Sequence, residues 1–204
     1  KQVEFSGSGS QPNMVLFDIQ SAERAEVAEL VQQSGMPLIQ QVPIVTTRIE
    51  TVDGLTKARY EAEHPQDTTS RKQGRRRFGP PQDEVERIPG WVWDREYRVT
   101  FRDTLIDTES VVEGTWTGTH TPGSPIKVSI SESLKRFMKA RIGTRVSFNV
   151  QGTVMDCEVA SVRKVDFNRV QTNFMVVFPK GVLERAPQFH VIVTKVQDPA
   201  QSAR

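Results

Sequence analysis

The chain has 204 residues, of which 36% are hydrophobic and 25% are charged, with 27 Lys+Arg against 25 Asp+Glu. This length suits one domain or two small subdomains that bury a real core. The single cysteine, Cys157, excludes an intramolecular disulfide. The apolar run "MVVF" (175–178) is far shorter than the roughly 20 residues that span a bilayer. Because the first residue is Lys rather than Met, we expect the chain to be part of a longer protein.

The first 54 residues read as a linker followed by a strand–helix–strand unit. "FSGSGSQPN" (5–13) is linker-like, and "MVLFDIQ" (14–20) predicts a short strand. The next segment predicts a helix with Ser21 as N-cap, which Gly35 ends. A second strand, rich in β-branched residues, then reaches the turn "DG" (53–54).

Residues 55–90 form a polar stretch, punctuated by Pro and Gly, in which we expect a partly mobile loop. Five cations cluster there: Arg71, Lys72, Arg75, Arg76 and Arg77. The formal net charge is +2, so the chain without these five carries −3 (2 − 5), and the basic character is local. A solvated loop is the interpretation favoured by composition; contact with lipid or a partner is the sharper alternative.

The segment "WVWDREYRVTF" (91–101) predicts one half-buried strand with an aromatic face. Further along, Ser131 is expected to cap a helix over 131–142 that Gly143 closes, with Phe137 and Met138 facing the core. "RVSFNV", "QG" and "TVMDCEVASVRKV" predict a hairpin, in which alternation puts Cys157 on the packed face. "FHVIVTKV" predicts a last strand, so the fold class is α+β.

A search for reactive groups finds no convergent set. His64, His120 and His190 stand in unlike contexts, and HExxH, CxxC, GxSxG, Walker A and GxGxxG motifs are absent from the sequence. Asp103, Asp107 and Glu109 are interpreted as a solvated loop rather than a catalytic pair. The sequence therefore predicts no catalytic residue, no metal ligand and no cofactor.

Nucleic-acid binding is also not favoured. Single-strand binders set exposed aromatic residues among cations. Here Trp91, Trp93 and Phe101 share a parity with Val99, which indicates burial in a core. We expect no nucleic-acid partner.

The order of these segments resembles one family. "VLFDIQ", "TTRIETVDG", "REYRVTFRDTL", "VVEGTW", "VSISESLKRFMKARIGTRVSFNVQG" and "VRKVDF…NFMVVFPKGVLE" together are similar to the extracytoplasmic core of FtsX/MacB-type ABC transporter permeases, nearest to their YbbP-like branch. The resemblance runs from about Asn13 to Val196, with an interruption over 61–90. Thr144 stands where such permeases commonly have Asp.

The resemblance implies a domain on the periplasmic side of the bacterial inner membrane, between two transmembrane helices of its permease. It implies that ATP is hydrolysed by a separate cytoplasmic ATPase dimer, that this domain is not an enzyme, and that it couples helix motion to export or extraction of a hydrophobic or lipid-linked substrate. A second permease copy or a pseudo-repeat is a further implied partner.

The resemblance also implies a porter-like part built from both ends of the chain and a smaller β-rich part. The expected organisation is a linker after a removed transmembrane helix (1–12), the two halves of the porter-like part (13–54 and 159–197), the polar loop region (55–90), the β-rich subdomain (91–158) and a tail toward the next transmembrane helix (198–204). The alternative to this function is a soluble ligand- or protein-binding adaptor module.

Overall fold

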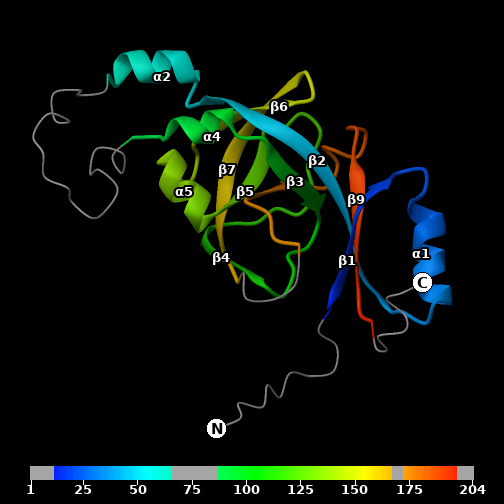
Figure 1. Cartoon of the computed structure of the whole chain (residues 1–204). Coiled ribbons are helices and arrows are strands. Elements are labelled where there is room, and N and C mark those ends of the chain that lie inside the picture. Colours follow the sequence, from blue (N-terminus) through cyan, green and yellow to red (C-terminus); the bar gives the residue numbers. More distant parts are fainter. Residues whose placement is uncertain (1–11, 66–86, 167–171, 197–204) are drawn as a thin grey trace, which may run out of the picture.

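The structure, a computed structural model, describes residues 12–65, 87–166 and 172–196 (Figure 1). Four helices lie within these residues: α1 (Arg24–Gln33), α2 (Lys57–Glu63), α4 (Gly90–Asp94) and α5 (Glu132–Met138). The strands are β1 (Met14–Gln20), β2 (Leu38–Val52), β3 (Tyr97–Arg102), β4 (Glu109–Gly114), β5 (Ile126–Ser131), β6 (Arg145–Val150), β7 (Thr153–Val165), β8 (Val176–Pro179) and β9 (Phe189–Thr194). No helix among the described residues is long and apolar enough to cross a membrane.

The strands form one mixed sheet in the order β1-β9-β2-β3-β8-β5-β7-β4, and β6 pairs with β2 and β7. The pairs β3–β8 and β5–β7 are parallel, and the other pairs are antiparallel. The described residues are thus rich in strands and contain few helices, in a mixed sheet, with which the predicted α+β class is compatible.

The 15-residue strand β2 links distant parts of this sheet (Figure 1). Residues 38–44 pair with β9, 45–47 pair with β3, and 48–52 pair with β6. At about 3.3 Å per residue, such a strand covers about 45 Å. β2 therefore connects the end of the sheet where β9 finishes to the end where α2 begins.

The first and last strands of the described chain lie side by side. β1 pairs antiparallel with β9, with Met14 opposite Thr194. Leu38, at the start of β2, is also opposite Thr194. The N-terminal strand thus packs on the C-terminal strand. The division into a porter-like and a β-rich part stays a prediction.

The sheet has buried side chains on both faces. Val45 belongs to the large core beneath α2, α4 and α5, whereas the adjacent Ile44 belongs to a second core on the opposite face. In β8, Val176 and Phe178 join the first core and Val177 joins the second. A third, small cluster lies under α1. The alternation expected for a half-buried β3 is therefore wrong at Thr100, which is buried too.

Both outer strands of the sheet are interrupted by irregularities. In β1 the register shifts between Leu16 and Ile19, and Asp18 has a positive φ of 62°. In β4 the register shifts between Val111 and Glu113. Bulges of this kind bend an edge strand and break its regular row of hydrogen-bonding groups.

The prediction of one strand over 91–101 is wrong for its first part. Residues 90–94 form the short helix α4, and the strand begins only at Tyr97. Pro89 precedes the first helical residue with extended backbone angles, so the chain turns into a helix there. In a helix the two tryptophans no longer share a face, so Trp93 is buried while Trp91 is 38% exposed. The Trp91 ring contacts the Phe137 ring edge to face, with the ring centroids 4.9 Å apart.

The helix predicted over 131–142 is shorter than expected. Ser131 caps it as predicted, because its side chain accepts a hydrogen bond from Leu134 N. The helix ends at Met138, where Lys139 adopts the left-handed conformation with φ 56°. Gly143, which was expected to close the helix, instead lies in a turn that follows it, with φ 89°. Met138 is buried in the core as predicted, and Phe137 is only partly buried.

Among the other local predictions, two turns are confirmed and one helix cap is wrong. The turns at 53–54 and 151–152 are confirmed, with positive φ at both residues of each. Ser21 is not the cap of α1, which begins at Arg24. Its hydroxyl instead donates to Gln188 O at 3.2 Å and lies 3.2 Å from His190 Nε2.

The polar region 55–90 is more ordered at its two flanks than predicted. Thr56 caps α2 by accepting from Arg59 N, and Tyr60 Oη accepts from Ile88 N at 2.9 Å across the gap in the described chain. Residues 66–86, and with them the five cations at 71, 72, 75, 76 and 77, lie outside the described residues.

Candidate functional site

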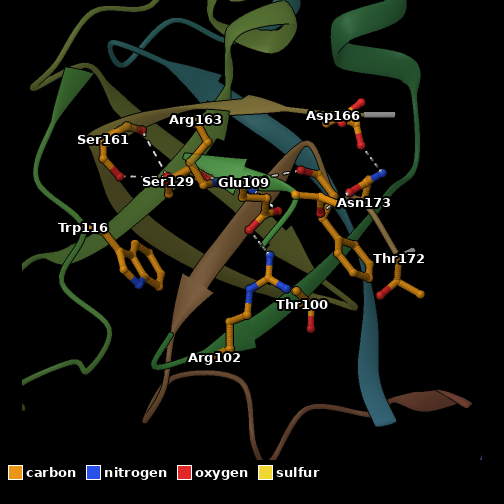
Figure 2. Close-up of polar contacts among 12 residues, drawn as sticks. Thr100, Arg102, Glu109, Trp116, Ser129, Ser161, Arg163, Asp166, Thr172 and Asn173 are labelled. Atoms are coloured by element: carbon orange, nitrogen blue, oxygen red, sulfur yellow. Dashed lines mark hydrogen bonds and ion pairs between the residues drawn. The ribbon is translucent and has the colours of Figure 1, made fainter. Parts of the chain in front are cut away.

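Three charged side chains meet inside the sheet (Figure 2). Glu109, the first residue of β4, forms ion pairs with Arg163 of β7 through Oε1 and with Arg102 of β3 through Oε2. The side chains of Glu109 and Arg163 are fully buried. The sheet brings them together because β4 pairs with β7, with Val165 opposite Glu109.

Every donor nitrogen of the Arg163 guanidinium has an acceptor. Its Nε donates to Ser129 Oγ at 3.0 Å, its Nη1 donates to Glu109, and its Nη2 donates to Phe174 O at 3.0 Å. Ser161 Oγ donates to the same Ser129 hydroxyl at 2.7 Å. This single side chain therefore ties β7 to β4, to β5 and to the segment before β8.

Burial affects the acidity of both arginines. It lowers the pKa of Arg163 to about 10, against the opposing influence of the Glu109 carboxylate. It also lowers the pKa of Arg102, again opposed by Glu109. Both guanidinium groups stay charged at neutral pH, so the cluster carries two positive charges and one negative. A buried charge is tolerated when it is paired and hydrogen-bonded. Arg163 meets both conditions, whereas Arg102 is paired with Glu109 but its buried Nε has no hydrogen-bond partner.

The solvated-loop interpretation is therefore wrong for Glu109. The alternation that placed Cys157 on the packed face does not extend to Arg163, because the register of β7 shifts between Val159 and Ser161. Val162 therefore joins the core of Cys157 and Val159, whereas Arg163 lies on the opposite face beside Ser129. The spacing in the sequence thus gave no signal for this buried arginine. Asp103 does lie at the surface, where it pairs with Lys180 at 3.4 Å. Hydrogen bonding to Lys180 lowers the pKa of the Asp103 carboxyl.

The histidines and the cysteine also lie apart from one another. His190 is buried beside Ser21, and its pKa is lowered by burial and by the nearby Arg24. His64 stacks on Tyr60 with ring centroids 4.3 Å apart. Burial raises the pKa of the Cys157 thiol to about 12. Among the described residues no three His, Cys, Asp or Glu side chains gather as metal ligands would.

A half-open groove of about 400 Å³ lies beside the start of β3. Its apolar lining includes Phe17, Ile44 and Phe174, and its border carries the charged residues Arg95, Glu96 and Arg98. This volume lies within the range of small-molecule sites. Phe17 is 62% exposed and directly precedes Asp18, the residue with positive φ in the β1 bulge. An exposed phenylalanine next to a strained residue marks the groove as a candidate contact site.

The chain ends of the described part form a second distinctive feature, here called the terminal clasp (Asn13 and Val196). Asn13 Nδ2 donates to Val196 O at 2.9 Å, and Val196 N donates to Asn13 Oδ1 at 2.8 Å. Asn13 N also donates to Thr194 O at 3.2 Å. One carboxamide therefore extends the β1–β9 pairing by a further pair of hydrogen bonds, and holds the two ends side by side.

No family model matches the chain. A stretch of 95 residues, 47% of the chain, is 32% identical to an Escherichia coli (strain K12) protein, the uncharacterized ABC transporter permease YbbP. The match spans 11% of YbbP, so the chain corresponds to a small part of that relative. A crystallised domain of a "putative Permease protein" from Porphyromonas gingivalis matches over 85% of this chain and 63% of the crystallised chain. The sequence identity is 9% and the TM-score is 0.40, a structural similarity too low to support a conclusion.

YbbP, to which 95 residues of the chain align, is a permease of the kind that the sequence segments indicated. The resemblance of this chain to a domain of a YbbP-like ABC transporter permease is thereby confirmed.

Proposed function

We propose that the chain is a non-catalytic extracytoplasmic domain of a bacterial ABC transporter permease, inserted between two transmembrane helices. The terminal clasp carries this proposal. A domain inserted between two helices has to leave the membrane and return to it at neighbouring points, and domain insertion favours ends that lie close together. Asn13 and Val196 are in direct contact, which meets that requirement.

In this proposal the domain couples motion of the membrane helices, driven by a separate cytoplasmic ATPase dimer, to export or extraction of a substrate. The substrate class that we propose is hydrophobic or lipid-linked. The apolar side of the groove, formed by Phe17, Ile44 and Phe174, suits an apolar chain. Because Arg95, Glu96 and Arg98 bring both signs of charge to its border, the groove does not select the charge of the substrate.

The position of the clasp supports an orientation in which this end of the domain faces the membrane. Thr194, next to the clasp, is opposite Leu38, whereas α2 follows the other end of β2. The intervening strand covers about 45 Å. We therefore propose that α2 lies at the end of the domain remote from the membrane.

A topology measurement on the full-length protein tests the proposal. Alkaline phosphatase inserted at Gly123, where the structure leaves open space around the glycine, should be active, because this enzyme functions only outside the cytoplasm. A green fluorescent protein inserted at the same site should stay dark when exported through the general secretory route. A bright fluorescent fusion with an inactive phosphatase fusion would contradict the proposal, as would a reading frame without an apolar segment on each side of the chain.

A further inference from the structure

The corner where β1, β9 and β2 meet is fastened by side chains as well as by strand pairing. Besides the two hydrogen bonds of the clasp, the buried Thr194 donates its hydroxyl to Pro37 O at 2.7 Å. Thr194 is thus held from both sides, since Met14 and Leu38 both stand opposite it. Asn13 reaches Val196 beyond the end of β9, where strand pairing would otherwise stop.

The geometry of this corner determines how it responds to load. β1 and β9 are antiparallel, and the chain enters the first and leaves the second at the same end of the sheet. A force that separates the two connections acts on the hydrogen bonds one pair at a time, beginning with the outermost pair. The outermost pair here is the reciprocal contact of Asn13 and Val196.

We propose that Asn13 is a positioning residue that keeps the two membrane connections together, so that helix motion moves the sheet as a unit instead of separating β1 from β9. Load that enters at the clasp passes through Thr194 into β2. This strand pairs in succession with β9, β3 and β6 and so carries the displacement to the α2 end of the molecule. The mechanical role rests on the proposed function; the strength of the clasp can be measured on this chain alone.

Two substitutions at Asn13 and one elsewhere test the inference. Asn13→Ala removes both side-chain hydrogen bonds, and Asn13→Asp removes the donor and keeps an acceptor for Val196 N. Asn149→Ala is the matched control, because the Asn149 carboxamide also bonds a backbone N–H, that of Gly152 at 2.8 Å, in the hairpin between β6 and β7. The measurements are amide hydrogen exchange at Val196 and the force of the first rupture when the chain is pulled through its two ends.

We expect Asn13→Ala to accelerate exchange at Val196 about tenfold, because two hydrogen bonds of ordinary strength are lost. The first rupture force should fall in the same variant. Asn13→Asp should retain most of the protection at Val196, and Asn149→Ala should leave both quantities at the wild-type value. Unchanged exchange and rupture force in Asn13→Ala, or an equal change in Asn149→Ala, would overturn the inference.

These measurements separate the two proposals. If the topology fusions contradict a membrane-inserted domain while Asn13→Ala still weakens the ends, the proposed function fails and the clasp remains a property of the fold. If the fusions support the domain while Asn13→Ala changes nothing, the inference fails and the proposed function stands.

Discussion

Glu109 is the residue on which the internal charges depend. Removing its charge leaves Arg102 and Arg163 buried together without a counter-charge. Breaking a buried ion pair from one side costs about 3–5 kcal/mol. We therefore expect Glu109→Gln to lower the free energy of unfolding by about that amount in chemical denaturation.

The control is the exposed pair of Lys135 and Glu113. Because surface ion pairs contribute about 1 kcal/mol or less, Glu113→Gln should change stability by no more than that. If Glu109→Gln were as mild as Glu113→Gln, the buried cluster would not have the role assigned to it.

His190 gives a second prediction at the scale of one residue. Its folded-state pKa is lowered from the usual 6.5, so the unfolded state binds the proton more readily than the folded state. Stability is then fully present above about pH 6.5 and is lost as the pH falls through the lowered folded pKa. Thermal melts between pH 7 and 5 should show this loss in the wild type and a smaller one in His190→Gln. Equal slopes in the two proteins would show that His190 does not titrate as described.

Single residues also show what the sequence could reveal. Ser131 was recognised as a cap, and Cys157 as a packed thiol, because both depend on their immediate neighbours. The partners of Glu109 are 7 and 54 positions away along the chain, and only the strand order brings them together. Composition and spacing cannot supply such partners. The same holds for Asn13 and Val196, which are 183 positions apart.

At the scale of an element, helical spacing in the sequence predicted the existence of α5 but not its length or both of its core residues. Met138 is buried, while Phe137 is partly exposed beside Trp91. Met138→Ala should cost about 2–5 kcal/mol, as expected for a buried methionine. Phe137→Ala should cost less, because its surroundings are partly open to solvent. Urea unfolding of the two variants compares them directly, and a larger loss for Phe137→Ala would reverse the assignment of the buried face.

The end of α5 gives another prediction. Lys139 has the left-handed backbone conformation that glycine adopts without strain. Lys139→Gly should therefore relieve backbone strain worth up to about 1 kcal/mol of unfolding free energy, set against the interaction that Lys139 makes. Asp53, which also has positive φ, is the contrasting case, since its Oδ1 accepts from Arg145 N at 2.9 Å. Asp53→Gly should bring no gain, and a gain there with none at Lys139 would refute the explanation.

The bounds of strands were predicted well where the alternation of apolar residues ran over many positions and a turn motif marked the end of the strand. The strand over 14–20 and the hairpin strands over 145–150 and 153–165 have the predicted bounds. The sequence predicts a strand at 91–94 because Trp91 and Trp93 share a parity with Tyr97, Val99 and Phe101. A five-residue helix between Pro89 and Arg95 buries Val92 and Trp93 equally well, and periodicity cannot distinguish the two over so few residues.

At the scale of the whole molecule, the two flanks of 66–86 contact each other directly. Tyr60 Oη accepts from Ile88 N, and Lys57 pairs with Asp94 at 2.6 Å. Replacing 66–86 by a short Gly/Ser linker should therefore leave stability within about 1 kcal/mol, because closing a loop of different length costs little. The melting temperature checks this, and neutralising the five cations together is the companion variant. A large loss of stability in either protein would contradict the prediction.

The register shifts in β1 and β4 protect copies of this domain from pairing with one another through their outer strands. A regular outer strand is a template on which the strand of a neighbour can pair, and repeated pairing of that kind produces fibres. Here the two outer strands of the sheet path, β1 and β4, are each interrupted by a shift of register. Dense packing of such domains at one membrane surface should therefore raise their local concentration without starting strand-to-strand aggregation.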